Sequence, residues 1–367
     1  MSNYKRVVWH QFFDACFVIL KRGERPITIN ELLNEQETLR QIRKHHIQKL
    51  YAWNNPPGIL LCHKHGNWIR WQKRELKNGH PITTDLHKTE TELAEKLAVN
   101  LYRIICIQTI QNQLNDIEKL IRSRYSNRQS KLDDIAQEEL SQSEPADIAK
   151  NSAGANVLAE GAIRKLFYRV RNCPSEPADF FHVDSPYRQL IIHFLRIEYA
   201  GVIDWYNGDF PQNQEHPEHL LYEVKLGYKV RSKSEVLIAD RLYDEGILFH
   251  YEELLYLTES DPYPDFYIPF SPVEKYIWEH FGAMDKNNYF HRTRGRVLNY
   301  MDSKWFPGIN MVTTYETKAN PLEATQVDQK VSMLKTRYRL AFPDLPPDES
   351  FNMYDLADYA KFCEMEV

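Results

Sequence analysis

Residues 261–282 read DPYPDFYIPFSPVEKYIWEHFG, and this stretch specifies the centre of the expected fold. Two short runs rich in aromatic and β-branched residues predict neighbouring strands at about 264–270 and 273–281. The first run contains Asp265 and the second contains Glu279. A carboxylate among apolar neighbours is costly unless it is protonated, paired with a cation or bound to a metal ion. The flanking sequence must therefore explain why both are present.

The elements on either side of this stretch give the order of the expected core. Upstream, a helical pattern at about 232–245 ends at Gly246 and leads into a strand at about 247–257. Downstream, a helix at about 287–304 precedes a strand that reads INMVTTYE, residues 309–316. The sequence therefore predicts an α/β unit with the order α-β-β-β-α-β.

Three carboxylates in this unit each have a structural explanation. Glu235 completes an S-x-x-E capping box with Ser232, although helical register also places it on the core-facing stripe. Asp265 opens a strand, where a turn-forming aspartate is common. Glu279 shares a strand face with Lys275, which is a candidate ion-pair partner. Together, however, the three form an oxygen-only ligand set that suits Mg²⁺ or Mn²⁺, ions that activate water and offset charge on a scissile phosphate.

These segments resemble the PD-(D/E)XK nuclease superfamily. The similar segments are RSKSEVLIADRLYDEGI (231–247), YPDFYI (263–268) and YIWEHFG (276–282), and the last resembles family members whose final motif reads E-H-F-G. The resemblance covers about residues 220–318. It implies a restriction-endonuclease-like mixed sheet flanked by helices, a divalent-metal site and cleavage of nucleic acid.

The resemblance also implies roles for individual residues. Glu235 matches the helix glutamate, Asp265 the strand aspartate and Glu279 the following acid, while Glu252 matches an often acidic position on the first strand. These four are the implied ligands of Mg²⁺ or Mn²⁺. The chain departs from the family at Phe281, where the signature has a lysine that orients or activates the attacking water.

A cation elsewhere would have to replace that lysine. The candidates are Lys275 on the same strand and Arg292, Arg294, Arg296 and Lys304 on the following helix. Arginine is a poor proton acceptor but a good phosphate clamp. Lys275 and Lys304 are therefore the candidate catalytic residues, and Arg294 and Arg296 are candidate contacts to nucleic acid.

Charge divides the chain into three parts. Residues 1–131 carry 22 Lys and Arg against 12 Asp and Glu, residues 132–160 carry 1 against 7, and residues 161–367 carry 23 against 32. We predict a basic, mostly helical N-terminal region with a β-hairpin, an acidic linker, and a nuclease-like domain that ends in a helix. A basic region beside a carboxylate-rich domain is typical of proteins that bind polyanions.

The hairpin of the N-terminal region reads HKHGNWIRWQKRELKNG, residues 63–79. Its basic residues Arg70, Lys73 and Arg74 are candidate contacts to phosphates, while its tryptophans stack on bases or pack on the domain. A hairpin with one buried aromatic face and one solvated basic face explains the pattern equally well. CHKHG at its start lacks the second ligand pair of a structural zinc site.

The helices of the N-terminal region are expected at about 5–22, 30–52 and 88–125. If this region does not bind nucleic acid, these helices become the candidate surface for a homodimer or a protein partner. His45 and His46 are predicted on the solvated face of the second helix.

Several function classes lack their sequence motifs. The chain contains no P-loop, no glycine-rich dinucleotide loop, no G-x-S-x-G elbow and no apolar run long enough to span a membrane. Five scattered cysteines favour a reducing compartment, and we expect a cytoplasmic protein without membrane contact. The expected function is Mg²⁺- or Mn²⁺-dependent phosphodiester hydrolysis, with DNA favoured over RNA and endonuclease over exonuclease. The alternative is a catalytically inactive nucleic-acid-binding or interaction protein on a nuclease-like scaffold.

Overall fold

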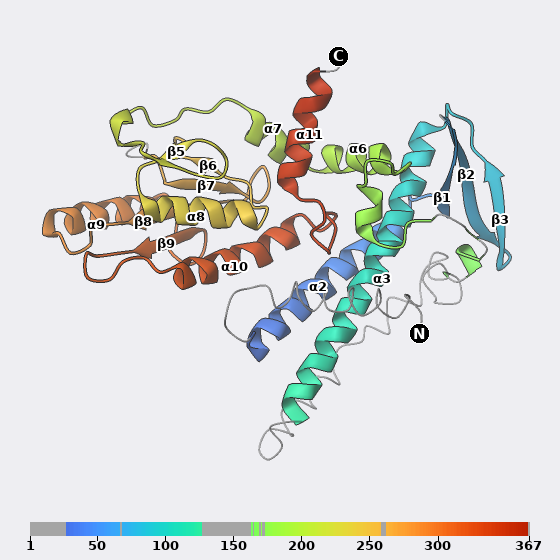
Figure 1. Ribbon diagram of the computed structural model, residues 1–367, viewed down its shortest axis with the longest axis horizontal. Coiled ribbons are helices and arrows are strands. Elements are labelled where there is room, and N and C mark those ends of the chain that lie inside the picture. Colours follow the sequence, from blue (N-terminus) through green and yellow to red (C-terminus); the bar gives the residue numbers. More distant parts are fainter. Residues whose placement is uncertain are drawn as a thin grey trace, which may run out of the picture.

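The structure is a computed structural model that describes residues 27–66, 68–126, 163, 165–168, 170, 173–257 and 262–365. These residues form a mixed α/β protein with α-helices and three small sheets, which confirms the expected class (Figure 1). The predicted helix at 5–22 and the acidic segment at 132–160 lie outside the described residues. No helix in the described ranges has both the length and the apolar character needed to cross a bilayer.

The sheet that carries the predicted site has four strands in the order β6-β7-β8-β9. The strands are β6 (His250–Tyr251), β7 (Phe266–Pro269), β8 (Lys275–Phe281) and β9 (Met311–Tyr315). The first three pair antiparallel, and β9 pairs parallel with β8. A parallel neighbour requires a crossover, and a helix supplies it here.

Two helices complete this unit in the order predicted from the sequence. They are α8 (Lys233–Asp244), which precedes β6, and α9 (Asn287–Asp302), which connects β8 to β9. The first predicted strand, at 247–257, is too long. Only two of its residues pair with β7, because Glu252 has a φ of 51° and turns the backbone out of the extended conformation.

Side chains along β7 and β8 alternate between two apolar layers, as the period of a strand requires. One layer contains Phe266, Ile268, Tyr276 and Trp278 together with residues of α8 and of α10 (Ala324–Ala341). The other contains Tyr267, Ile277 and Phe281, together with Tyr300 of α9. The sheet is therefore covered by α8 and α10 on one face and by α9 on the other.

The N-terminal region contains two helices and a second sheet. The elements are α2 (Ile29–Leu50), β1 (Ile59–His65), β2 (Trp68–Lys77), β3 (His80–Asp85) and α3 (Thr91–Ser126). The three strands form an antiparallel meander, so the predicted hairpin gains a third strand. Asn78 and Gly79 connect β2 to β3 with φ values of 53° and 76°, the left-handed conformations that a tight hairpin requires. Figure 1 shows this meander and the four-stranded sheet at opposite ends of the molecule.

Short elements connect the two ends. They are η2 (Pro177–Phe180), α6 (Arg188–Glu198), α7 (Ala200–Asn207), η3 (Pro217–His219), β4 (Tyr222–Glu223), β5 (Lys229–Val230) and the C-terminal α11 (Met353–Met365). The largest apolar cluster includes residues of α3, α6, α8, α10 and α11. The two ends of the molecule therefore share one continuous core.

The prediction that His45 and His46 lie on a solvated face is wrong for His46, which is fully buried. Its Nδ1 lies 3.7 Å from Oδ1 of Asp344, and Nε2 of His45 lies 2.9 Å from Oδ2 of the same carboxylate. Arg103 of α3 also donates to Asp344 at 3.2 Å. Asp344 lies just after α10 and is distant from α2 in sequence. Its contacts with His45 and His46 explain why this face of α2 is buried.

Candidate active site

The first turn of α8 holds Glu235 in the interior. Ser232 is the N-cap, and its hydroxyl accepts a hydrogen bond from the Glu235 backbone N–H at 3.1 Å. The Glu235 carboxylate accepts hydrogen bonds from the Ser232 hydroxyl (2.8 Å), the Arg231 backbone N–H (3.0 Å) and the Tyr251 hydroxyl (2.6 Å). Of the two hydrogen bonds in the predicted capping box, the one from the Glu235 backbone N–H to the Ser232 hydroxyl is therefore present. The carboxylate bonds the Ser232 hydroxyl and Tyr251 of β6 rather than the Ser232 backbone N–H that a full capping box requires.

Asp265 and Glu279 lie opposite each other on neighbouring strands. Phe266 pairs with Trp278 in the antiparallel register of β7 and β8, so the next position places Asp265 against Glu279. Oδ2 of Asp265 accepts a hydrogen bond from the backbone N–H of His280 at 2.6 Å, which directs this carboxylate toward β8. Glu279 is fully buried. The structure therefore brings together the two carboxylates that the sequence singled out.

The electrostatics of this pair are unfavourable without a cation. Burial, followed by repulsion from Glu279 and from Glu235, raises the pKa of Asp265 well above its ordinary value. Burial likewise raises the pKa of Glu279, although Arg296 and Tyr300 oppose the rise. Two interacting carboxyls of this kind share a proton or require positive charge nearby.

Helix α9 supplies the partners of Glu279. Nη1 of Arg296 lies 3.2 Å from Oε2, and the Tyr300 hydroxyl donates to Oε1 at 2.5 Å. Residues four apart share a helix face, so both reach the sheet together. Lys275, the candidate ion-pair partner on the same strand, does not pair with Glu279, and its ammonium lies 5.1 Å from the ring centroid of Tyr267 instead. The contact of Tyr300 with Glu279 was not predicted, although the R-x-x-x-Y spacing from Arg296 to Tyr300 is the signal that places both on one helix face.

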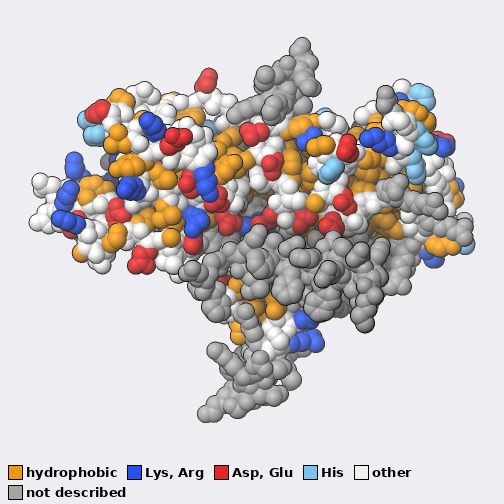
Figure 2. Space-filling view, in the orientation of Figure 1, with side chains coloured by type: hydrophobic (Ala, Val, Ile, Leu, Met, Phe, Trp, Pro, Cys, Tyr) orange, Lys and Arg blue, Asp and Glu red, His pale blue; other side chains and the backbone are white. Residues whose placement is uncertain are grey.

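Phe281, which stands where the nuclease signature has a lysine, belongs to the apolar core. Phe281 is buried, and its ring stacks on Tyr315 with centroids 5.4 Å apart. Lys304 lies beyond the end of α9 rather than within it, with a φ of 70°. Arg292 and Arg294 are exposed on α9, and Figure 2 shows Lys and Arg side chains gathered at this end of the molecule.

Glu252 is held differently from the other predicted ligands. Nε of Arg231 lies 2.7 Å from its Oε1, and Nη2 lies 3.0 Å from its Oε2. This two-point pair engages both carboxylate oxygens and balances the charge. Since Arg231 also donates its backbone N–H to Glu235, it joins these two carboxylates to one another.

The three basic residues predicted to contact nucleic acid from the meander all have protein partners. The partners are Asp85 for Arg70 (2.7 Å), Glu75 for Lys73 (2.8 Å), and the carbonyl oxygens of Leu166 (2.6 Å) and Tyr168 (2.7 Å) for Arg74. Arg74 thus connects the segment that contains Leu166 and Tyr168 to β2. Acidic neighbours offset the charge of the other two, so this surface is less basic than its sequence indicated.

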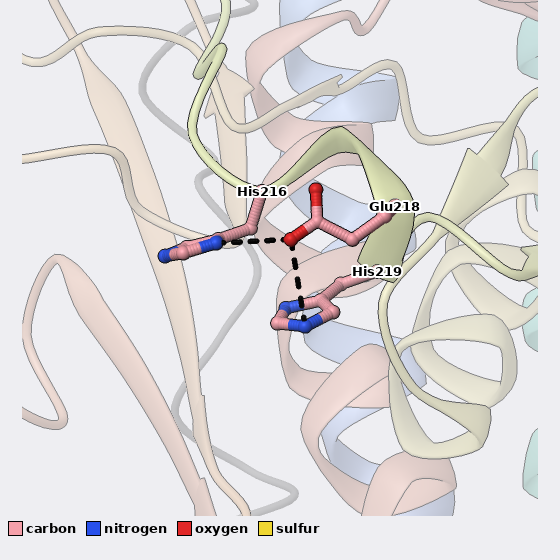
Figure 3. A group of neighbouring side chains, drawn as sticks. All are labelled: His216, Glu218 and His219. Atoms are coloured by element: carbon pink, nitrogen blue, oxygen red, sulfur yellow. Dashed lines mark hydrogen bonds and ion pairs between the residues drawn. The ribbon is translucent and has the colours of Figure 1, made fainter.

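One compact group of potential metal ligands was not predicted. Within the described residues, only His216, Glu218 and His219 form a set of three His, Cys, Asp or Glu side chains whose ligand atoms all lie within 4.8 Å of one another (Figure 3). The carboxylates of Glu235, Asp265 and Glu279 are therefore more widely spaced than this group.

Comparison of the chain with protein-family models, with curated proteins and with solved structures finds no match.

Proposed function

We propose that this chain is a divalent-metal-dependent nuclease that hydrolyses phosphodiester bonds, with DNA as the favoured substrate. The observation that carries the proposal is the placement of Asp265 directly opposite Glu279, on adjacent strands, where burial and mutual repulsion raise the pKa of Asp265. A strongly perturbed acid pair at the end of a sheet is typical of a functional site. The α-β-β-β-α-β order supports a restriction-endonuclease-like core.

The donor set suits Mg²⁺ or Mn²⁺, because these ions prefer oxygen ligands. Asp265 and Glu279 would hold the ion, with Glu235 nearby. No donor from the described residues hydrogen-bonds Oδ1 of Asp265, so this oxygen is available as a ligand. A bound ion of this kind activates water and offsets the charge that develops on the scissile phosphate.

The residues around the pair have separate roles in this proposal. Tyr300 fixes the orientation of Glu279 through its hydroxyl. Arg296 supplies the positive charge that Phe281 cannot, and its side chain is 48% exposed, which leaves it accessible to a phosphate group. Because arginine does not give up its proton, Arg296 acts as a phosphate clamp rather than a base. Arg292 and Arg294 on the same helix extend this basic surface.

The competing proposal is a catalytically inactive nucleic-acid-binding or interaction protein on the same scaffold. Two observations favour it. Phe281 is a core residue in the place of the family lysine, and Arg296 already neutralises Glu279.

A cleavage assay on the full chain separates the two proposals. The purified protein is incubated with Mn²⁺ and with linear, circular and single-stranded DNA and RNA, alongside the variants Asp265→Asn and Glu279→Gln. We expect at least one DNA substrate to be cut, and each variant to reduce the rate by at least about 100-fold, because metal ligands act as a unit. Glu274→Gln is the matched control, since it neutralises an exposed carboxylate just before β8 and should leave the rate unchanged.

The outcomes of this assay are distinct. Wild-type protein that binds DNA but cuts no substrate supports the inactive scaffold. Equal cleavage by Asp265→Asn and the wild type removes Asp265 from the mechanism, and with it the proposed site.

A further inference from the structure

The 3₁₀ turn η3 gathers two imidazoles and a carboxylate at the surface. Nδ1 of His216 lies 3.1 Å from Oε1 of Glu218, and Nε2 of His219 lies 3.9 Å from the same oxygen. Figure 3 shows the Glu218 carboxylate between the two rings. All three side chains are exposed, so an ion from solvent can reach them without any movement of the fold.

The backbone that carries these side chains is held in place. His216 has a φ of 53°, a left-handed conformation that is uncommon for a residue with a side chain, and Pro217 fixes the next φ. Arg231 donates to the carbonyl oxygens of Glu215 (2.7 Å) and His216 (2.8 Å). The same guanidinium pairs with Glu252, so the turn is anchored to the buried end of β6. This anchoring reduces the backbone ordering that ion binding would otherwise require.

We propose that His216, Glu218 and His219 bind one Zn²⁺ ion. Two histidines and one glutamate form a known kind of zinc ligand set, and nitrogen ligands favour zinc over Mg²⁺. Zinc–ligand bonds of about 2.0–2.1 Å in a tetrahedral site place the ligand atoms about 3.4 Å apart. The separations of 3.1 and 3.9 Å from Oε1 of Glu218 lie on either side of that value, and all the ligand atoms lie within 4.8 Å of one another, so side-chain rotations that bring the two imidazoles onto one ion complete the site. Its fourth position faces solvent and takes water.

This zinc site is independent of the proposed nuclease activity. Its ligands are imidazoles and one exposed carboxylate on η3, whereas the proposed catalytic ion is held by oxygen ligands on β7 and β8. Zinc binding joins three side chains of the turn at residues 216–219, whose backbone Arg231 already holds against Glu252. It therefore stabilises this turn and adds no ligand to the pair of Asp265 and Glu279.

A titration of the tag-free, chelator-treated full chain with Zn²⁺ tests the site. Calorimetry is performed in excess Mg²⁺, so that the oxygen ligands of Asp265 and Glu279 are already occupied if they bind a metal. We expect one equivalent of Zn²⁺ to bind with micromolar affinity. His219→Ala and Glu218→Gln should each weaken binding by at least about tenfold, because each removes one of three protein ligands.

His193→Ala is the matched control. His193 is also exposed and lies 2.7 Å from Glu95, but among the described residues it belongs to no group of three potential metal ligands. This variant should bind Zn²⁺ as the wild type does. The proposal is overturned if the wild type does not bind Zn²⁺ at millimolar concentration, or if a His216→Ala/His219→Ala double variant binds it with unchanged affinity. Neither result depends on whether the chain cuts DNA.

Discussion

Two buried carboxylate clusters in this molecule behave in opposite ways. At Asp344, burial alone would raise the pKa, but His45 and the charges of Arg103 and His46 hold it well below its usual range. At Asp265, burial and the neighbouring Glu279 both raise the pKa, and the backbone N–H of His280 only partly offsets them.

The difference separates a structural cluster from a candidate site. Asp344 also donates its backbone N–H to the Tyr199 hydroxyl, and its carbonyl oxygen accepts from the Tyr102 hydroxyl, so its polar groups are matched by partners from α2, from α3 and from the junction of α6 and α7. Such a matched cluster loses stability when one partner is removed. At the acid pair, Arg296 pairs with Glu279, but no cation among the described residues forms an ion pair with Asp265, whose charge a metal ion can balance. Removing a charge there should therefore cost little or increase stability.

The largest expected effect is at the matched cluster. Asp344→Asn should lower the free energy of unfolding by about 3–5 kcal/mol, because it leaves the buried Arg103 guanidinium without a counter-charge. Urea denaturation of the variant and the wild type measures this difference. A loss below about 1 kcal/mol would mean that the cluster is not a structural ion pair of the kind described.

A second effect of similar size appears as a pH dependence. Burial lowers the pKa of His46 from 6.5 to about 4, so the unfolded chain takes up a proton at a higher pH than the folded chain does. The stability contributed by neutral His46 is present above pH 6.5 and is lost as the pH falls toward about 4. The loss should reach about 3 kcal/mol, at about 1.4 kcal/mol per pKa unit.

Unfolding measured from pH 7 to pH 4 tests this slope. A His46→Leu variant should show a shallower pH dependence, while the exposed control His193→Ala should keep the wild-type slope. An unchanged slope in His46→Leu contradicts the assignment, because the titrating group would then lie elsewhere.

A smaller effect of opposite sign is expected at the acid pair. Without divalent metal, Asp265→Asn should raise the free energy of unfolding by about 1 kcal/mol, since it removes the repulsion from Glu279 and retains an oxygen that accepts the His280 N–H. Urea denaturation in chelator measures the change. Destabilisation as large as that of Asp344→Asn would show that the two clusters do not differ in the way proposed.

The smallest effect concerns Lys275. Its ammonium lies over the ring of Tyr267, at the opposite end of β8 from Glu279. Lys275→Ala should change the free energy of unfolding by about 0.5 kcal/mol or less and leave any cleavage rate nearly unchanged. Arg296→Met should instead abolish most cleavage. If Lys275→Ala abolishes cleavage and Arg296→Met does not, then Lys275 and not Arg296 supplies the positive charge of the missing lysine.

Local patterns predicted the centre of the fold and its acid pair. Period-two alternation and the turn between 270 and 275 place Asp265 and Glu279 on one face of adjacent strands, and this inference needs no distant contact. The partner of Glu279 was not predicted: the sequence offered Lys275 on the same strand, whereas Arg296 and Tyr300 of α9 contact Glu279, because the rotation of α9 against the sheet depends on packing between distant segments.

Contacts between distant segments account for the features that were not predicted from the sequence. Arg103 and Asp344 are 241 residues apart, so nothing near His46 indicated that this face of α2 would be buried. Helix α10 was missed although Val327, Val331, Leu334 and Tyr338 have helical spacing. These residues complete the largest apolar cluster, and the same helix also contacts α2.

Mg²⁺-dependent thermal unfolding of the full chain tests most directly whether the acid pair binds a metal ion. Mg²⁺ is used because it binds imidazoles weakly and so leaves the His216 cluster out of the measurement. We predict that millimolar Mg²⁺ raises the melting temperature of the wild type, as expected when an ion binds only the folded state. The shift should be lost in Asp265→Asn and Glu279→Gln and kept in Asp344→Asn, despite its lower stability. An unchanged shift in Asp265→Asn, or no shift in the wild type, would contradict the account.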